Sequence, residues 1–215
     1  MQRLFTFLLC IIAGAFAPRA TLQQSQPASR AAESSPASRP GAELLHSPAP
    51  SLDGVRWIDG AKRSVESFRG KVVLIRWWMS GCPYCINTAP ALAELAERYQ
   101  SKGLQIVAIY HPKPKPEPVE DANVLAGAKK IGLAENATYK NAIFLLGVDE
   151  DWTALKRYWL TTKRSFTSVS FIIDQKGAIR YVHPGGEYHK SDLPDHAKCA
   201  AELKEMEALI EKLLK

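Results

Sequence analysis

A short apolar run that leads almost directly into two cysteines constrains the fold of this chain more than any other feature. Residues 72–75 read Val-Val-Leu-Ile, which is typical of a strand buried on both faces of a parallel sheet. Cys82 and Cys85 follow shortly after it. Beyond them, apolar residues recur at helical spacing: Ala91, Leu92, Leu95, Ala96 and Tyr99. The pattern predicts a strand-to-helix junction, with Cys82 at or just before the start of the helix.

A helix start is a favourable place for a reactive cysteine. The first backbone N–H groups of a helix have no partner within it, and the positive end of the macrodipole lies there. Both stabilise a thiolate over a thiol, and the thiolate is the nucleophile. The spacing of Cys82 and Cys85 at such a junction therefore indicates a redox-active pair.

Strand-like and helix-like segments alternate from about residue 55, which predicts an α/β fold around a mixed sheet. Gly103 and Gly132 stand where helices should end, and residues 175–177 form a turn signal. The expected strands are residues 55–58, 72–78, 104–110, 142–146, 168–174 and 179–182. The expected helices are residues 86–101, 122–131, 153–159 and 195–214.

The N-terminal segment differs in composition from the rest of the 215 residues. Residues 1–17 combine a charged start with an apolar stretch and a small-x-small cleavage signal, which predicts a signal peptide. Residues 18–51 contain no aromatic side chain and are rich in Pro, Ser and Ala, so we expect a disordered linker. One folded domain, residues 52–215, would follow. The expected location is periplasmic or secreted, with membrane attachment only if the first segment stays uncleaved.

Two further patterns bear on partners and packing. The formal net charge is +6, but no stripe of Lys and Arg alternates with aromatics, so nucleic acid is not an expected partner. Residues 111–118 carry a proline at every second position, which predicts an extended surface loop.

In the last helix Cys199 falls on one stripe with Leu203, Met206, Ile210 and Leu213, so we expect it to face the core.

The residues Trp-Met-Ser-Gly-Cys-Pro-Tyr-Cys at positions 78–85, with Pro90 shortly after, resemble the thioredoxin fold. More narrowly, the chain is similar to the TlpA/ResA-like periplasmic thiol-disulfide oxidoreductases, whose Phe-Leu-Ile-Asp-x-x-Gly strand and turn are similar to residues 171–177. The resemblance covers roughly residues 51–215. It implies helices on both faces of the mixed central sheet, an N-terminal hairpin extension and an insertion after the third strand.

The resemblance also implies an enzyme that carries out thiol-disulfide exchange. Cys82 would attack a substrate disulfide, and Cys85, one helical turn inward, would resolve the mixed disulfide. Pro83 would stiffen the loop and remove one N–H group, while Tyr84 would offer an aromatic surface beside the sulfur. Of the two preceding tryptophans, Trp78 is expected to line the site. The direction of electron flow stays open.

Arg76 departs from the family pattern. Thioredoxins usually place a buried acid six residues before the first cysteine, where this chain has Arg76. A cation there would lower a nearby cysteine pKa and could not act as a base. The alternative is a structural role, in which Arg76 pairs with a carboxylate such as Glu94 or Asp174.

Ser168 and His183 are two further departures. Ser168 stands three residues before Phe171, where the family has a cis-proline that faces the cysteines. A cis bond before a non-proline residue costs about 3 kcal/mol, so either Ser168 grips substrate without one or the site is differently shaped. His183 follows the last strand, either as a proton donor or ligand near Cys82 or as an ordinary structural histidine.

Metal binding is the alternative to redox chemistry. Cys82, Cys85 and a histidine could hold Cu(I), as in Sco-type copper chaperones, although those proteins use a wider cysteine pair. The same two cysteines with His196 and Cys199 match a zinc ligand set on paper. The preferred hypothesis involves no metal and no cofactor beyond a redox-active disulfide between Cys82 and Cys85. Its partners would be protein thiols and disulfides and a redox partner protein.

Overall fold

The computed structural model describes residues 39–134 and 143–215. The expected signal peptide, the first part of the expected linker and residue 142 of an expected strand lie outside the described residues.

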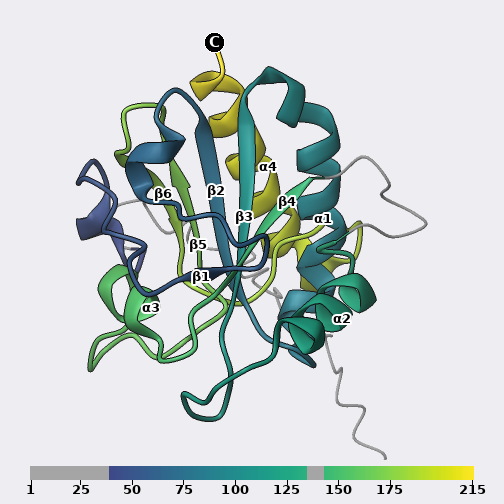
Figure 1. Ribbon diagram of the computed structural model, residues 1–215. Coiled ribbons are helices and arrows are strands. Elements are labelled where there is room, and N and C mark those ends of the chain that lie inside the picture. The colour runs from purple at the N-terminus through teal and green to yellow at the C-terminus, as the bar shows by residue number, and fades with distance from the viewer. Residues whose placement is uncertain (1–38, 135–142) are drawn as a thin grey trace, which may run out of the picture. The chain divides into compact units, whose positions relative to one another are not determined.

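One mixed six-stranded sheet organises the described residues, in the order β1-β4-β3-β2-β5-β6 (Figure 1). β2, β3 and β4 run parallel, whereas β1, β5 and β6 pair antiparallel with their neighbours. The strands are β1 Arg56–Trp57, β2 Val72–Trp78, β3 Leu104–Tyr110, β4 Phe144–Val148, β5 Ser170–Ile173 and β6 Ile179–His183. The predicted mixed sheet is confirmed, but β1 pairs with β4 and forms no N-terminal hairpin.

Helices cover both faces of the sheet, as predicted (Figure 1). Buried side chains of α1, α2 and α4 form one apolar cluster with one face, and those of α3 form a second cluster with the other. The helices are α1 Pro83–Tyr99, α2 Asp121–Ile131, α3 Thr153–Tyr158 and α4 Ala197–Leu213. Gly132 ends α2 in the left-handed conformation expected of a C-cap.

The insertion between β3 and α2 is confirmed as a loop. It contains no helix or strand. Of the alternating-proline segment, residues 111–118, residues 113–118 are exposed as predicted, whereas His111 and Pro112 are buried, contrary to the prediction. Within the described ranges, no helix combines the length and the apolar character needed to span a membrane.

Residues 39–51 correct the prediction of a disordered linker. They include a 3-10 helix, Ala42–Leu44, and run along the edge strand β6. His46 donates its backbone N–H to the carbonyl of Ile179, and Ile179 donates to Ser47. Leu44, Leu45 and Ala49 pack against the α3-side cluster. The composition of this segment predicted disorder wrongly, because a few packed apolar side chains and hydrogen bonds to the edge strand β6 suffice to order it.

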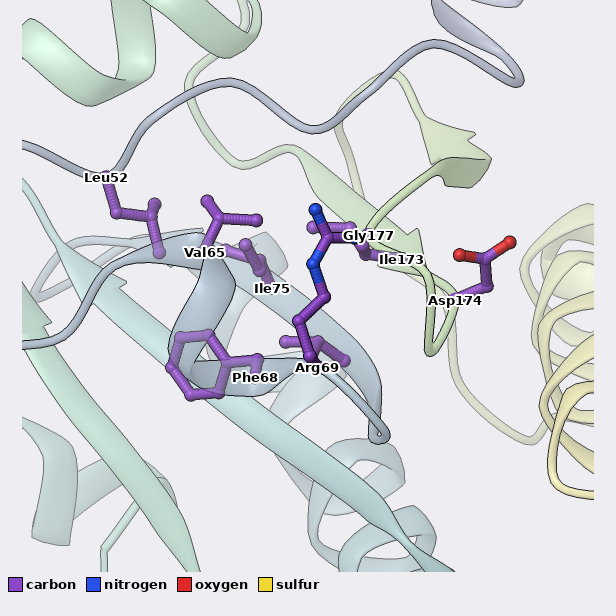
Figure 2. A pocket seen from close by; sticks show the side chains of 9 residues that line it. Leu52, Val65, Phe68, Arg69, Ile75, Ile173, Asp174 and Gly177 are labelled. Atoms are coloured by element: carbon purple, nitrogen blue, oxygen red, sulfur yellow. The ribbon is translucent and has the colours of Figure 1, made fainter.

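A narrow cavity on the α3 side of the sheet holds no candidate site. It lies beneath the 3-10 helix Val65–Phe68, and Figure 2 shows Val65, Phe68 and Ile75 at its wall. Its volume of about 10 Å³ is that of a single water molecule. Cys85 belongs to the cluster on the other face, so the cavity and the cysteines lie on opposite sides of the sheet.

Candidate active site

The junction between β2 and α1 places the two cysteines as the sequence predicts. β2 ends at Trp78, and Gly81 turns the chain with a φ of 74°, a conformation that favours glycine. Cys82 is the N-cap of α1, and Pro83 takes the first helical position, where its missing N–H costs nothing. Cys85 follows one turn inward and is 2% exposed, while Cys82 is half-buried.

The two sulfurs differ sharply in acidity. A hydrogen bond from the Cys85 thiol lowers the pKa of Cys82 to about 6 despite partial burial; the Cys85 backbone N–H, the charge of Arg76 and the Tyr84 N–H act in the same direction. The pKa of Cys85 is raised, first by its bond to Cys82 and then by burial. At neutral pH Cys82 is therefore the thiolate and Cys85 the thiol that donates to it.

This asymmetry predicts the pH dependence of alkylation. The rate of Cys82 modification by iodoacetamide should rise about tenfold per pH unit below pH 6 and level off above it, because only the thiolate reacts. Stopped-flow alkylation of reduced Cys10→Ser/Cys199→Ser protein measures this, with Cys85 protected by burial. A midpoint near the ordinary thiol value, about 8.5, would contradict the assignment.

Arg76 is a buried cation held by neutral groups. Its side chain is 1% exposed and donates to the carbonyls of Ser168 (2.7 Å) and Gly186 (2.8 Å) and to the hydroxyl of Ser170 (3.3 Å). The alternative of a carboxylate partner is wrong. Asp174 pairs with Arg180, and Glu94 pairs with Lys190. As expected, the positive charge of Arg76 lowers the pKa of Cys82.

Strand register places Arg76 in a row of polar residues that no local sequence pattern indicates. Arg76 on β2 stands beside Ser170 on β5, and Ser170 stands beside His183 on β6. Tyr188, from the loop after β6, covers this row. Its hydroxyl lies 3.0 Å from the Ser170 hydroxyl, and its ring lies beside the Arg76 guanidinium. A buried arginine needs several hydrogen-bond acceptors. An arginine within the apolar strand was therefore the sequence signal from which polar neighbours could have been expected.

His183 does not join the cysteines. It is 1% exposed, its Nε2 lies 3.1 Å from a Glu202 carboxylate oxygen on α4, and its ring packs edge-on against Tyr188. Burial lowers its pKa, partly offset by Glu202. The hypothesis of a proton donor or ligand near Cys82 is corrected to the structural alternative. His183 is therefore not the histidine that the copper alternative would need beside the two cysteines.

Ser168 follows a trans peptide bond, because Lys113–Pro114 is the one cis peptide among the described residues. Ser168 is buried, and its carbonyl is already engaged by Arg76. Of the two alternatives, the structure favours a differently shaped site, in which this loop is fastened to Arg76.

The residues around the pair divide into buried and exposed. Trp78, expected to line the site, has no exposed surface; it packs against Tyr110 in the cluster that contains Cys85. Gly127 lets α2 approach the neighbouring Ser80, since a Cβ there would lie 2.7 Å from the Ser80 hydroxyl. Tyr84 is 43% exposed, as expected of a side chain that offers a surface beside Cys82.

Curated relatives are similar in sequence to part of the chain. The thiol-disulfide oxidoreductase ResA of Geobacillus thermodenitrificans is 25% identical over 139 residues, which cover 65% of this chain and 68% of that protein. The thiol-disulfide oxidoreductase YkuV of Bacillus subtilis is 24% identical and is covered over 86% of its length. Protein DipZ of Mycobacterium tuberculosis is 27% identical over 149 residues, but these span 19% of that longer protein.

Solved structures show the fold to be thioredoxin-like. A thiol-disulfide isomerase from Corynebacterium glutamicum superposes with a TM-score of 0.55 at 20% identity, covering 78% of this chain and 97% of that one. The thioredoxin domain of a thiol-disulfide oxidoreductase from Bacteroides vulgatus gives 0.53 at 16% identity, covering 77% and 97%. The Redoxin family model matches residues 47–199. Since this match spans most of the chain and includes both cysteines of the junction, the protein belongs to the Redoxin family.

Proposed function

We propose that this protein is an exported thiol-disulfide oxidoreductase that exchanges disulfides with protein substrates through Cys82 and Cys85. The observation that carries the proposal is the contrast between the two sulfurs. One is half-exposed and has a pKa of about 6, and the other is buried beneath it with a raised pKa. That contrast suits an attacking thiolate and a resolving thiol.

The reaction divides into two exchanges. The Cys82 thiolate attacks one sulfur of a substrate disulfide, whose S–S bond breaks to leave a substrate thiolate and a mixed disulfide. Cys82 then carries no charge and accepts no hydrogen bond, so the first cause of the raised Cys85 pKa disappears. Cys85 loses its proton and attacks the Cys82 sulfur. The second substrate thiolate leaves, the substrate is reduced, and a Cys82–Cys85 disulfide remains.

The surroundings of Cys82 support a protein substrate. Tyr84 and Ile86 flank it on the first turn of α1 and are 43% and 44% exposed. Exposed apolar side chains beside a reactive group commonly contact a partner protein. Export is supported by the signal-like residues 1–17. The names of the relatives ResA and YkuV support the activity.

The reduction potential tests the proposal. Equilibration with glutathione buffers, read by mass after alkylation, should show a two-electron couple. Its potential should fall by about 59 mV per pH unit below pH 6 and by about 30 mV above, because the reduced pair then binds one proton instead of two. A value near −270 mV is typical of a reductase, and one near −120 mV of an oxidant.

Asp195→Asn, which changes an exposed carboxylate outside the redox site, is the matched control and should leave the potential unchanged. Failure of Cys82 and Cys85 to form a disulfide with each other in oxidised glutathione would refute the proposal.

A further inference from the structure

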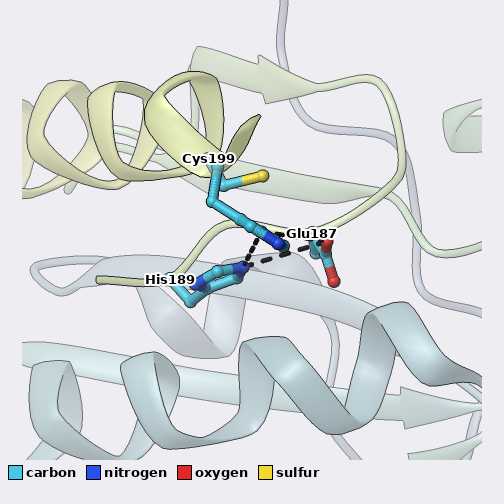
Figure 3. Close-up of side chains that lie close together, drawn as sticks. Glu187, His189 and Cys199 are labelled. Atoms are coloured by element: carbon cyan, nitrogen blue, oxygen red, sulfur yellow. Dashed lines mark hydrogen bonds and ion pairs between the residues drawn. The ribbon is translucent and has the colours of Figure 1, made fainter. Parts of the chain in front are cut away.

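A second group of chemically active side chains lies away from the Cys82–Cys85 pair. Glu187 and His189 come from the loop after β6, His196 is the N-cap of α4, and Cys199 lies in the first turn of that helix. Each contributes one potential ligand atom, and these four atoms lie within 4.8 Å of one another (Figure 3). We call these residues the EHHC cluster.

The distances between the ligand atoms fit the tetrahedral coordination of a metal ion. His189 Nε2 lies 3.2 Å from His196 Nδ1, and a Glu187 oxygen lies 3.8 Å from each of these nitrogens. Zinc bound to nitrogen or oxygen at about 2.0–2.1 Å places neighbouring tetrahedral ligands about 3.3–3.4 Å apart, and a thiolate at about 2.3 Å widens this slightly. Shifts of a few tenths of an ångström would complete the geometry.

Hydrogen bonds within the cluster do not account for this arrangement. The Glu187 oxygen at 3.8 Å is too far from either ring nitrogen to accept a hydrogen bond. The two imidazoles share one hydrogen bond of 3.2 Å between His196 Nδ1 and His189 Nε2. The cluster therefore brings four potential metal-ligand atoms together, and one hydrogen bond joins two of them.

The outer contacts of two ligands orient them toward a common centre. His189 Nδ1 lies 3.0 Å from the backbone carbonyl of Lys190, which can only accept, so this nitrogen carries the proton and Nε2 presents its lone pair to the cluster. The other carboxylate oxygen of Glu187 accepts a hydrogen bond of 2.6 Å from the Asn87 amide on α1. Metal-bound histidines and carboxylates are commonly held in this way.

We propose that the EHHC cluster is a Zn²⁺ site. One thiolate, two imidazoles and one carboxylate are the donor types that zinc accepts, and four protein ligands are typical of a structural rather than a catalytic zinc. A groove lined by Ile86, Asn87 and His196 gives access to it from solvent. The proposed site combines His196 and Cys199 with Glu187 and His189, and it leaves Cys82 and Cys85 free for redox chemistry.

The position of the cluster gives the ion a role in the architecture of the redox site. Glu187 directly follows Gly186, whose carbonyl holds the Arg76 guanidinium. Zinc would fasten this loop to the start of α4 and to α1 through Asn87, and would hold the acceptor of Arg76 in place.

Cys199 in this cluster corrects the expectation that it faces the core. Leu203, Met206 and Ile210 of the same stripe are buried, but Cys199 is half-buried at the end of the helix, where the loop with Glu187 and His189 covers it instead of the sheet.

Zinc titration tests the proposal. Full-length protein in which Cys10, Cys82 and Cys85 are replaced by Ser is kept reduced, so that Cys199 is the one thiol able to bind metal, and Zn²⁺ is titrated in competition with a chromophoric chelator. We expect one ion per chain, and an affinity on the order of 100-fold weaker in Cys199→Ser and His189→Ala. Asp195→Asn is the matched control, because this exposed carboxylate lies next to His196 but outside the cluster.

The absorption spectrum of bound Co²⁺ gives a second measurement, which separates loss of a metal ligand from loss of folding. The same protein should show intense tetrahedral d–d bands and a thiolate-to-cobalt charge-transfer band, and its Cys199→Ser variant should lose the charge-transfer band while circular dichroism stays unchanged. No binding at micromolar Zn²⁺, or equal binding by this protein and its Cys199→Ser variant, would overturn the proposal.

Discussion

Cys82→Ser is expected to reduce the rate of disulfide exchange to that of buffer alone, whereas Cys85→Ser performs the first exchange and accumulates mixed disulfides. A serine hydroxyl is not ionised at neutral pH and cannot replace the thiolate. In Cys85→Ser the hydroxyl still donates to the Cys82 sulfur, so the largest cause of the lowered Cys82 pKa survives and attack proceeds. The resolving step then has no nucleophile.

Non-reducing gels of the variants incubated with a disulfide-containing protein measure this, with mass spectrometry to locate the crosslink. Cys199→Ser serves as the control and should trap nothing. Trapping by Cys82→Ser through Cys85 would reverse the assignment of attacking and resolving sulfurs.

Arg76→Met is expected to change both the acidity of Cys82 and the stability of the fold. Loss of the buried positive charge should raise the Cys82 pKa, because this charge helps to stabilise the thiolate. Loss of the guanidinium leaves the carbonyls of Ser168 and Gly186 without their donor, which should lower the free energy of unfolding by roughly 2–4 kcal/mol. Alkylation rates against pH and urea unfolding measure the two effects.

Two further variants separate charge from hydrogen bonding. Arg76→Lys keeps the charge but cannot reach three separate acceptors, so it should retain a low Cys82 pKa and still lose stability. Arg180→Met is the matched surface control. It removes a partly exposed ion pair with Asp174 and should cost less than about 1 kcal/mol. An unchanged Cys82 pKa in Arg76→Met would show that this charge does not act on the thiolate.

The local features of the fold were predictable because they depend on neighbours in the sequence. The apolar run predicted β2 with its observed limits, residues 72–78, and helical spacing predicted α1 apart from its first turn. The first turn was missed because Pro83, Tyr84 and Cys85 carry no helical periodicity. Gly103 and Gly132 marked the ends of helical segments through their left-handed conformation.

Contacts between segments that lie far apart in the sequence could not be predicted from such local patterns. Periodicity shows which face of an element is apolar, but not which residues of other elements meet it. The partners of Arg76 come from β5 and from the loop after β6, and their positions depend on strand register. The stripe on α4 was correct for Leu203 and Met206 and failed for Cys199, because Cys199 lies beside Glu187 and His189 of the loop after β6.

The sequence by itself determined the strand-to-helix junction and the place of Cys82 at a helix start. These follow from local hydrophobicity and helix geometry. Only the tertiary structure decided that Arg76 has neutral partners, that His183 belongs to Glu202, and that Glu187, His189, His196 and Cys199 converge. Each of these depends on where the chain returns after β6, and that return is governed by the packing of its loop against α1 and α4.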